Sequence, residues 1–175
     1  MRRILLMSFL AISVLGSFAQ DTVIRKICGV EFGTDQETAR RVLVSTYGTP
    51  SDDMFKYLGF EDIDYAGIRF SFAFFTFQHD ASTSYLNDVM LIIKCKTADE
   101  AKNKRERLRR ILEQKYELSE GTNDQKFKYY QGGVSPTNPN DYGFILGVHK
   151  DKVTKGGGYL VTLKYGRYNY VDESF

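Results

Sequence analysis

Three carboxylates stand together in the segment GFEDIDYAG, and they are the side chains best suited to acid–base chemistry. Glu61, Asp62 and Asp64 all fall in this short stretch. Two carboxyl groups can hydrolyse a glycosidic bond when one of them stays protonated at neutral pH, and carboxylate oxygens also bind Ca²⁺. The same residues are typical of a charged turn between two strands. We expect the charged turn, and a hydrolase is the lowest of the functions considered.

The other reactive residue types do not complete a catalytic site. His79 and His149 each lack a second histidine three or four residues away, so no zinc-binding spacing exists. The sequence has no Gly-x-Ser-x-Gly nucleophile elbow, and the segment KGGGY lacks the lysine and serine of a phosphate-binding loop. We therefore predict that the protein is not an enzyme, and we predict no catalytic residue, metal or cofactor.

The two cysteines leave two interpretations open. Cys28 lies in KICGVEF and Cys95 in LIIKCKT, both strand-like segments followed by a helix. An even number of cysteines in an oxidising compartment suggests a disulfide, and neighbouring strands could bring the two α-carbons within bridging distance. Two small buried thiols are the alternative. Such thiols would be inert, because an apolar environment raises the pKa of a thiol.

The chain begins with a segment typical of a secretory signal peptide. Arg2 and Arg3 precede an apolar stretch at residues 4–15, and small residues flank a cleavage point between Ala19 and Gln20. The apolar stretch is too short to span a bilayer, which needs about 20 residues. We expect residues 1–19 to be a signal peptide, residues 20–175 to be one domain, and the protein to be secreted or periplasmic.

The charge of the mature chain argues against nucleic-acid binding. Removal of residues 1–19 takes away two basic residues and no acidic ones, which leaves 22 of each kind. A nucleic-acid-binding protein needs an excess of basic residues. No later apolar stretch is long enough to span a membrane, and a chain of this length can bury one core.

Two segments carry the signals of amphipathic helices. Thr34 and Glu37 form a capping box before one helix, which Gly48 and Pro50 end. Thr97 and Glu100 form a second capping box before ADEAKNKRERLRRILEQKYEL. The basic residues of this second helix could bind phosphate, but acidic residues are interspersed with them, so we expect a solvated face.

The segments around these helices predict an antiparallel sheet. Three strands should follow each helix: FKYLGF, AGIRFSFAFFTFQ and LNDVMLIIKCK after the first, and KFKYYQ, YGFILGVHK and GYLVTLKYGRYNYV after the second. In the second of these strands, alternation places Ile68, Phe70, Phe72 and Phe74 on one face. We predict an α+β fold with two helices packed on one face of an antiparallel sheet. The order of elements suggests a tandem repeat, with halves at residues 27–95 and 96–171.

This organisation resembles the fold of the β-lactamase inhibitor proteins and of small envelope proteins that share it, including a lipoprotein of outer-membrane assembly. The resemblance lies in FGTDQETARRVLVSTYGTP, in the meander, and in the second helix ending LRRILEQKYEL. It implies tandem helix-plus-sheet repeats whose single concave sheet grips a partner. Inhibition of a lactamase does not carry over, since no binding residue matches. The QDTV start and the many tyrosines are similar to secreted proteins of gut Bacteroidetes.

Aromatic residues on the sheet are the remaining candidate for a functional surface. If the helices cover one face, aromatic residues on the other form either a second core layer or a binding surface. We expect a non-enzymatic protein-binding module, such as an inhibitor or an envelope accessory factor. A glycan- or peptidoglycan-binding protein is the alternative. The candidate binding residues are Tyr129, Tyr130, Tyr165, Tyr168 and Tyr170.

Overall fold

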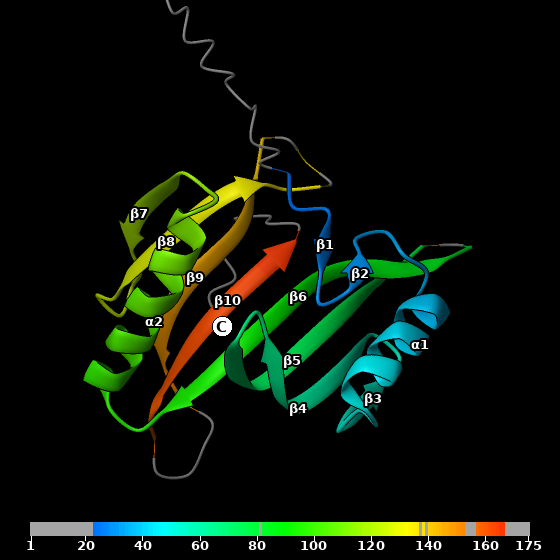
Figure 1. Ribbon diagram of the computed structural model, residues 1–175, viewed down its shortest axis with the longest axis horizontal. Coiled ribbons are helices and arrows are strands. Elements are labelled where there is room, and N and C mark those ends of the chain that lie inside the picture. Colours follow the sequence, from blue (N-terminus) through cyan, green and yellow to red (C-terminus); the bar gives the residue numbers. More distant parts are fainter. Residues whose placement is uncertain (1–22, 81, 137, 139, 153–156, 167–175) are drawn as a thin grey trace, which may run out of the picture.

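The computed structural model describes residues 23–80, 82–136, 138, 140–152 and 157–166 (Figure 1). The expected signal peptide lies outside these residues, as do Tyr168 and Tyr170. The described chain has an α+β fold built on a large antiparallel sheet, which confirms the predicted fold class. No helix in this part of the chain is long and apolar enough to cross a membrane.

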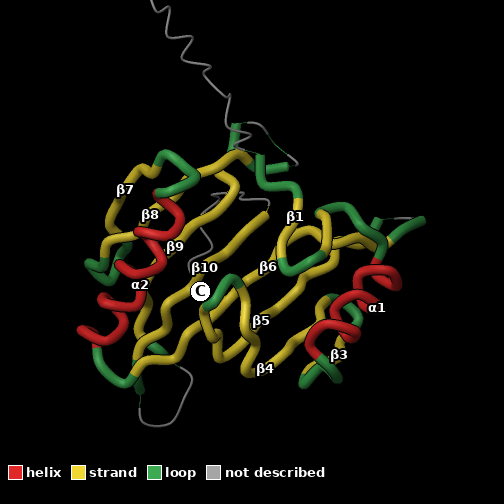
Figure 2. The backbone as a smooth tube through the Cα atoms, in the orientation of Figure 1, coloured by secondary structure: helices red, strands yellow, loops and turns green. Residues whose placement is uncertain are grey.

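Two helices and ten strands make up the described chain, and Figure 2 shows their distribution. The helices are α1 (Gln36–Tyr47) and α2 (Ala98–Glu113). The strands are β1 (Lys26–Ile27), β2 (Val30–Glu31), β3 (Asp52–Met54), β4 (Tyr57–Tyr65), β5 (Ile68–His79), β6 (Ser84–Cys95), β7 (Leu118–Thr122), β8 (Lys128–Val134), β9 (Tyr142–Lys150) and β10 (Tyr159–Gly166).

Eight of the strands form one sheet in the order β3-β4-β5-β6-β10-β9-β8-β7, with every neighbouring pair antiparallel. β1 and β2 form a separate small hairpin. Four strands follow each helix, where the sequence predicts three. The two additional strands, β3 and β7, are the short edges of the sheet. Their Asp, Ser, Glu and Gly residues are disfavoured in strands, so the sequence gives no signal for them.

Helix α1 begins one residue later than predicted. Its N-cap is Asp35, whose Oδ1 accepts a hydrogen bond from the Thr38 N–H at 2.9 Å. The predicted capping box of Thr34 and Glu37 is therefore wrong, because the Thr34 carbonyl accepts a hydrogen bond from β6 and the Asp35 side chain is free to cap. Gly48 ends the helix as predicted, in a conformation with φ of 85° that favours glycine.

Helix α2 begins as predicted. Thr97 Oγ1 accepts a hydrogen bond from the Glu100 N–H at 3.2 Å. The Glu100 carboxylate reaches back to accept the Lys96 N–H at 2.9 Å, one residue before the cap. Two backbone donors at the start of the helix are thereby satisfied by side chains.

One face of the sheet, which we call the core face, buries the main core. Side chains alternate along a strand, so directly paired residues on neighbouring strands share a face. Leu58, Phe75 and Val89 are paired in this way across β4, β5 and β6, and all three are fully buried. Leu43 of α1 and Leu108 of α2 belong to the same cluster. Both helices therefore contribute to one core.

The β4–β5 hairpin changes face towards its turn. Regular alternation from Phe75 would put Ile63 and Phe70 on the opposite face, yet both are buried in the main core. Asp62 adopts a φ of 53°, which interrupts the alternation in β4, and Ser71 Oγ accepts the Lys94 N–H where β5 leaves β6. Residues 63–70, the folded hairpin end, thus turn over the core face and stand between α1 and α2 in Figures 1 and 2.

The predicted grouping of four residues on β5 is consequently only half right. Phe72 and Phe74 share a face, but Ile68 and Phe70 belong to the main core. A strict period of two cannot detect a strand that bends, and the bend is the reason for this difference.

A network of charges attaches α2 to β8. The Glu106 carboxylate accepts hydrogen bonds from Arg105 Nη2 at 2.8 Å, Arg109 Nε at 2.8 Å and the Tyr130 hydroxyl at 2.9 Å. Arg105 is buried and also donates to the Lys128 carbonyl at 2.7 Å. Burial would raise the pKa of Glu106, but the hydrogen bonds outweigh it and hold that pKa below its usual value.

Replacement of Glu106 tests this network. Glu106→Gln should lower the free energy of unfolding by about 2 kcal/mol at neutral pH, because Arg105 then stays buried without its carboxylate. The folded-state pKa of Glu106 lies below its unfolded value of 4.5. The contribution is therefore present above that pH and is lost as the pH falls through the folded-state pKa. Urea denaturation at neutral pH and near pH 3 measures both effects.

Glu113→Gln is the matched control. Glu113 pairs with the same Arg109 at 2.7 Å, but its side chain is 55% exposed, so its loss should cost about 0.5 kcal/mol or less. Equal losses in the two variants, or a Glu106→Gln effect that persists near pH 3, would contradict the account of how α2 is attached.

Candidate binding surface

The carboxylates of GFEDIDYAG do not form a catalytic pair. Arg69 Nε lies 3.4 Å from Asp62 Oδ1, and Arg69 Nη1 lies 3.8 Å from Asp64 Oδ2. The side chains of Asp62 and Asp64 are 69% and 72% exposed, and Glu61 is exposed on the other side of the strand. Such solvated, arginine-paired groups lack the buried carboxyl that glycoside hydrolysis requires. The predicted charged turn is wrong in its position, because all three residues lie within β4 and the turn to β5 falls at Ala66 and Gly67.

The structure places His79 and His149 apart from each other. In the described ranges, no group of three or more His, Cys, Asp or Glu side chains could hold a metal ion. His79 stacks on Phe55 near the tip of the β3–β4 hairpin, whereas His149 lies on β9. Their positions give each histidine a separate environment.

Both cysteines are buried free thiols, so the structure does not contain the disulfide considered from the sequence. Cys28 lies in the β1–β2 turn against Tyr47 and Tyr65, while Cys95 ends β6 close to Glu100. The two thiols therefore have different neighbours. Burial raises the pKa of Cys28 to about 12, which keeps it protonated and unreactive.

Of the three described tyrosines among the five proposed from the sequence, only Tyr129 lies on an accessible part of the sheet. Tyr130 and Tyr165 are 8% and 6% exposed and belong to the main core, so neither can form a binding surface. Tyr129 is half-buried and points to the opposite face. Tyr168 and Tyr170 lie outside the described residues. The face that a tyrosine occupies depends on the strand register, which the residue types alone do not show.

The face of the sheet opposite the core face, which we call the second face, carries a continuous group of apolar side chains. Phe72 pairs with Ile92, and Phe74 pairs with Met90. None of these four belongs to the main core cluster or packs against it, and Ile92 is nonetheless only 9% exposed. The apolar members of the second face are Tyr57, Phe72, Phe74, Met90, Ile92, Tyr129, Ile145 and Leu160.

Three of these rings form a row along one side of the second face. The Tyr57 and Phe74 rings meet edge to face at 5.9 Å, and the Phe72 and Phe74 rings stack at 6.2 Å. Lys94 Nζ lies 4.4 Å from the centre of the Phe72 ring, a cation–π geometry. Gly59 lies opposite Phe74, and a Cβ there would come within 3.2 Å of the ring, so glycine leaves the space that Phe74 occupies.

The row continues to an exposed hairpin tip. Met54 and Phe55, at the turn between β3 and β4, are 54% and 74% exposed. Phe55 is held in place, because its ring stacks on His79 at 4.0 Å and its carbonyl accepts a hydrogen bond from Gln36 Nε2 at 3.1 Å. Exposed large apolar side chains on a fixed turn are typical of binding surfaces. In the sequence, this exposed tip is visible only as the apolar pair Met54 and Phe55 between charged residues in the segment DDMFKY.

The polar part of the second face lies towards β10. Thr162 and Lys164 of β10 are half-buried there. Burial raises the pKa of the nearby Asp88 carboxyl, while Lys164 and a hydrogen bond with Thr76 lower it in part. The second face therefore combines an aromatic row on β4 and β5 with polar and charged side chains on β6 and β10 beside it.

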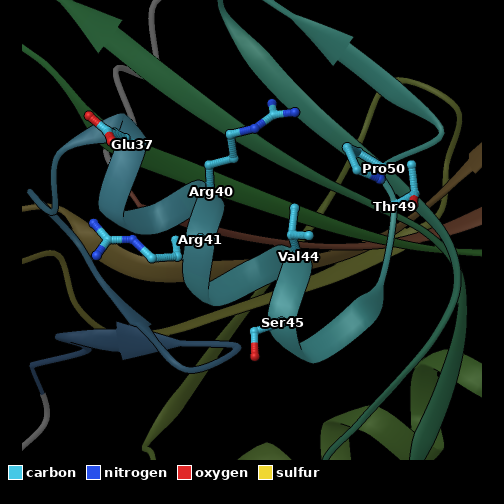
Figure 3. Close-up of a pocket in the computed structure, with 7 residues that line it drawn as sticks. All are labelled: Glu37, Arg40, Arg41, Val44, Ser45, Thr49 and Pro50. Atoms are coloured by element: carbon cyan, nitrogen blue, oxygen red, sulfur yellow. The ribbon is translucent and has the colours of Figure 1, made fainter.

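A hollow of about 580 Å³ beside α1 is a weaker candidate site (Figure 3). Arg40, on its border, forms an ion pair and two hydrogen bonds with Asp53 of β3, which compensate its charge. Val44 and Pro50 are the apolar residues of its lining. It is lined by Glu37, Arg40, Arg41, Val44, Ser45, Thr49 and Pro50.

Comparison with protein-family models, with curated proteins and with solved structures finds no match to this chain. The geometry of the described residues is therefore the basis for inferring the function of the chain.

Thiol titration distinguishes buried thiols from a disulfide. In the native protein at pH 8, a thiol reagent should react slowly with both cysteines, since burial raises the pKa of Cys28 and of Cys95. In guanidinium chloride without reductant, both should react at once. A denatured chain that offers no free thiol would show that Cys28 and Cys95 are bridged in the purified protein.

Truncation of paired phenylalanines tests whether the second face is a surface or a second core layer. Phe75→Ala should lower the free energy of unfolding by about 3–5 kcal/mol, because the side chain is fully buried. Phe74→Ala, one residue away on the second face, should cost about 1 kcal/mol. Urea denaturation compares the two. Equal costs would mean that another layer covers the second face.

Proposed function

We propose that the protein is a non-enzymatic binding module that holds a partner protein on the second face of its sheet. In this proposal α1, α2 and the folded hairpin end all cover the core face and leave the second face open. The observation that carries the proposal is the aromatic row of Tyr57, Phe74 and Phe72, which lies outside the main core. Apolar side chains grouped on an accessible surface mark sites of protein association.

The arrangement of the strands supports a tandem repeat. α1 is followed by the meander β3–β6, and α2 is followed by the meander β7–β10. The last strands of the two meanders, β6 and β10, pair at the centre of the sheet, and β3 and β7 form its two edges. This symmetry is what two helix-plus-meander halves would produce. It also fits a fold similar to the β-lactamase inhibitor proteins, in which one broad sheet grips a partner.

The chemistry of the second face favours a protein over a glycan. Its central side chains are Phe72, Phe74, Met90 and Ile92, which offer no hydrogen bonds to sugar hydroxyls. Two of the tyrosines expected to stack on a glycan, Tyr130 and Tyr165, are buried. Apolar side chains with polar side chains beside them are the usual composition of a protein interface. The signal-like start of the chain supports a secreted or periplasmic setting, where an inhibitor or envelope accessory factor would act.

Site-specific cross-linking tests this function. A photo-reactive amino acid replaces Met90 on the second face, or Val44 on the exposed side of α1, in the full chain expressed in the cells that produce it. The position at Met90 should cross-link one envelope or secreted protein, and the position at Val44 should not. The double variant F72S/F74S should weaken recovery of that protein about tenfold or more, because it removes two central aromatic contacts.

The matched control is V44S/Y142S, which removes two apolar side chains away from the second face and should leave recovery unchanged. Cross-linking from Val44 alone, or equal loss in both double variants, would contradict the proposal. Cross-linking of Met90 only to a second copy of this chain would instead make the second face a dimer interface.

A further inference from the structure

A small basic cleft lies between α2 and the folded hairpin end, away from the second face. Its volume is about 280 Å³. Arg69 lines it from the hairpin, while Lys104 and Arg107 line it from α2. Two segments far apart in the sequence thus bring three cations around one concave site. The floor is apolar and consists of Ile68, Ile93 and Leu108, all buried.

The cleft has more positive charge than its own carboxylate can compensate. Asp64 is the one acidic residue in the lining, and it lies 3.8 Å from Arg69. Lys104 and Arg107 are exposed, and neither takes part in an ion pair between described residues. Asp62 also pairs with Arg69, at 3.4 Å, so three cations and two carboxylates leave an excess of one positive charge. Other basic residues of α2, such as Arg105 and Arg109, are paired with Glu106.

A second hollow adjoins the cleft and extends it along α2. It has a volume of about 490 Å³ and shares Lys104 and Arg107 with the cleft. Asn103 and Glu100 complete its lining. The Asn103 amide can donate and accept hydrogen bonds with hydroxyl groups, and the Glu100 carboxylate can accept them. The two hollows together offer a cationic end and a polar end that includes one carboxylate.

We propose that this cleft binds the phosphate monoester of a hydroxyl-bearing carrier, such as a sugar phosphate. Arg69, Lys104 and Arg107 hold the phosphate, and Asn103 and Glu100 contact the carrier in the adjoining hollow. A phosphate monoester carries a charge of about −1.5 to −2 at neutral pH, and Lys104 and Arg107 are the lining cations that no ion pair between described residues compensates. Guanidinium groups bind phosphate oxygens through paired hydrogen bonds.

The concave geometry distinguishes this site from a solvated helix face. Lys104 and Arg107 alone would be ordinary surface residues of an amphipathic helix. The bend at Asp62 brings Arg69 of another element to the same cleft, and such convergence is what an anion site needs. The proposal is independent of the protein-binding function, because none of its residues belongs to the second face.

Titration by NMR at constant ionic strength tests the site with three probes: glucose 6-phosphate, inorganic phosphate and glucose. We expect glucose 6-phosphate to shift the amide signals of Gly67, Arg69, Lys104 and Arg107, and to bind more tightly than inorganic phosphate. Glucose alone should cause no shift. The variant K104Q/R107Q should weaken glucose 6-phosphate binding about tenfold or more, and R69Q should weaken it in the same direction.

The matched control removes the same charge from the same helix outside the cleft. K102Q/R110Q should leave the affinity within about twofold, since an effect of net charge alone is small at physiological salt. Equal weakening in the two double variants, or no shift at Gly67 and Arg69, would overturn the site. Equal affinities for glucose 6-phosphate and inorganic phosphate would overturn the assignment of the carrier to the adjoining hollow. All the substituted residues are exposed, so dispersed spectra should confirm folding.

Discussion

The pairing of β6 with β10 makes one sheet out of two meanders, and both faces of the protein depend on it. Eight successive residues pair along this ladder, from Cys95 with Tyr159 to Asp88 with Gly166. The register puts Leu91 opposite Leu163 on the core face and Ile92 opposite Thr162 on the second face. A slip of one residue would exchange the two faces. The ladder therefore fixes which side chains are buried and which remain available.

Each helix is attached to the sheet by an apolar side chain in the core and by charged side chains that reach a strand. α2 is fixed by apolar packing of residues such as Leu108 and by the Glu106 network that reaches Tyr130 of β8. α1 is fixed by Leu43 in the core and by the pair of Arg40 with Asp53 on the edge strand. The folded hairpin end fills the space between the helices. The basic cleft lies where the folded hairpin end meets α2, and the bend at Asp62 brings the two together.

Local sequence signals predict the helices and the central strands. They do not predict which face of the sheet a side chain occupies or where a strand bends. The caps at Thr97 and Gly48 depend on neighbouring residues alone, so sequence reasoning finds them. Tyr130 and Tyr165 were misplaced because the face of a residue depends on pairing with distant strands. The contribution of Arg69 to the cleft requires the positive φ of Asp62. Aspartate tolerates a positive φ, but an aspartate in the sequence does not by itself indicate one.

Hydroxyl-radical footprinting of the free chain from Gln20 to Phe175, at low protein concentration, tests the accessibility of the second face most directly. Our account predicts rapid oxidation of Phe72, Phe74 and Met90, with Phe75 protected by the core. Addition of the cross-linked partner should then protect the first three. Protection of Phe72, Phe74 and Met90 in the free monomer would contradict the account, because the second face would already be covered.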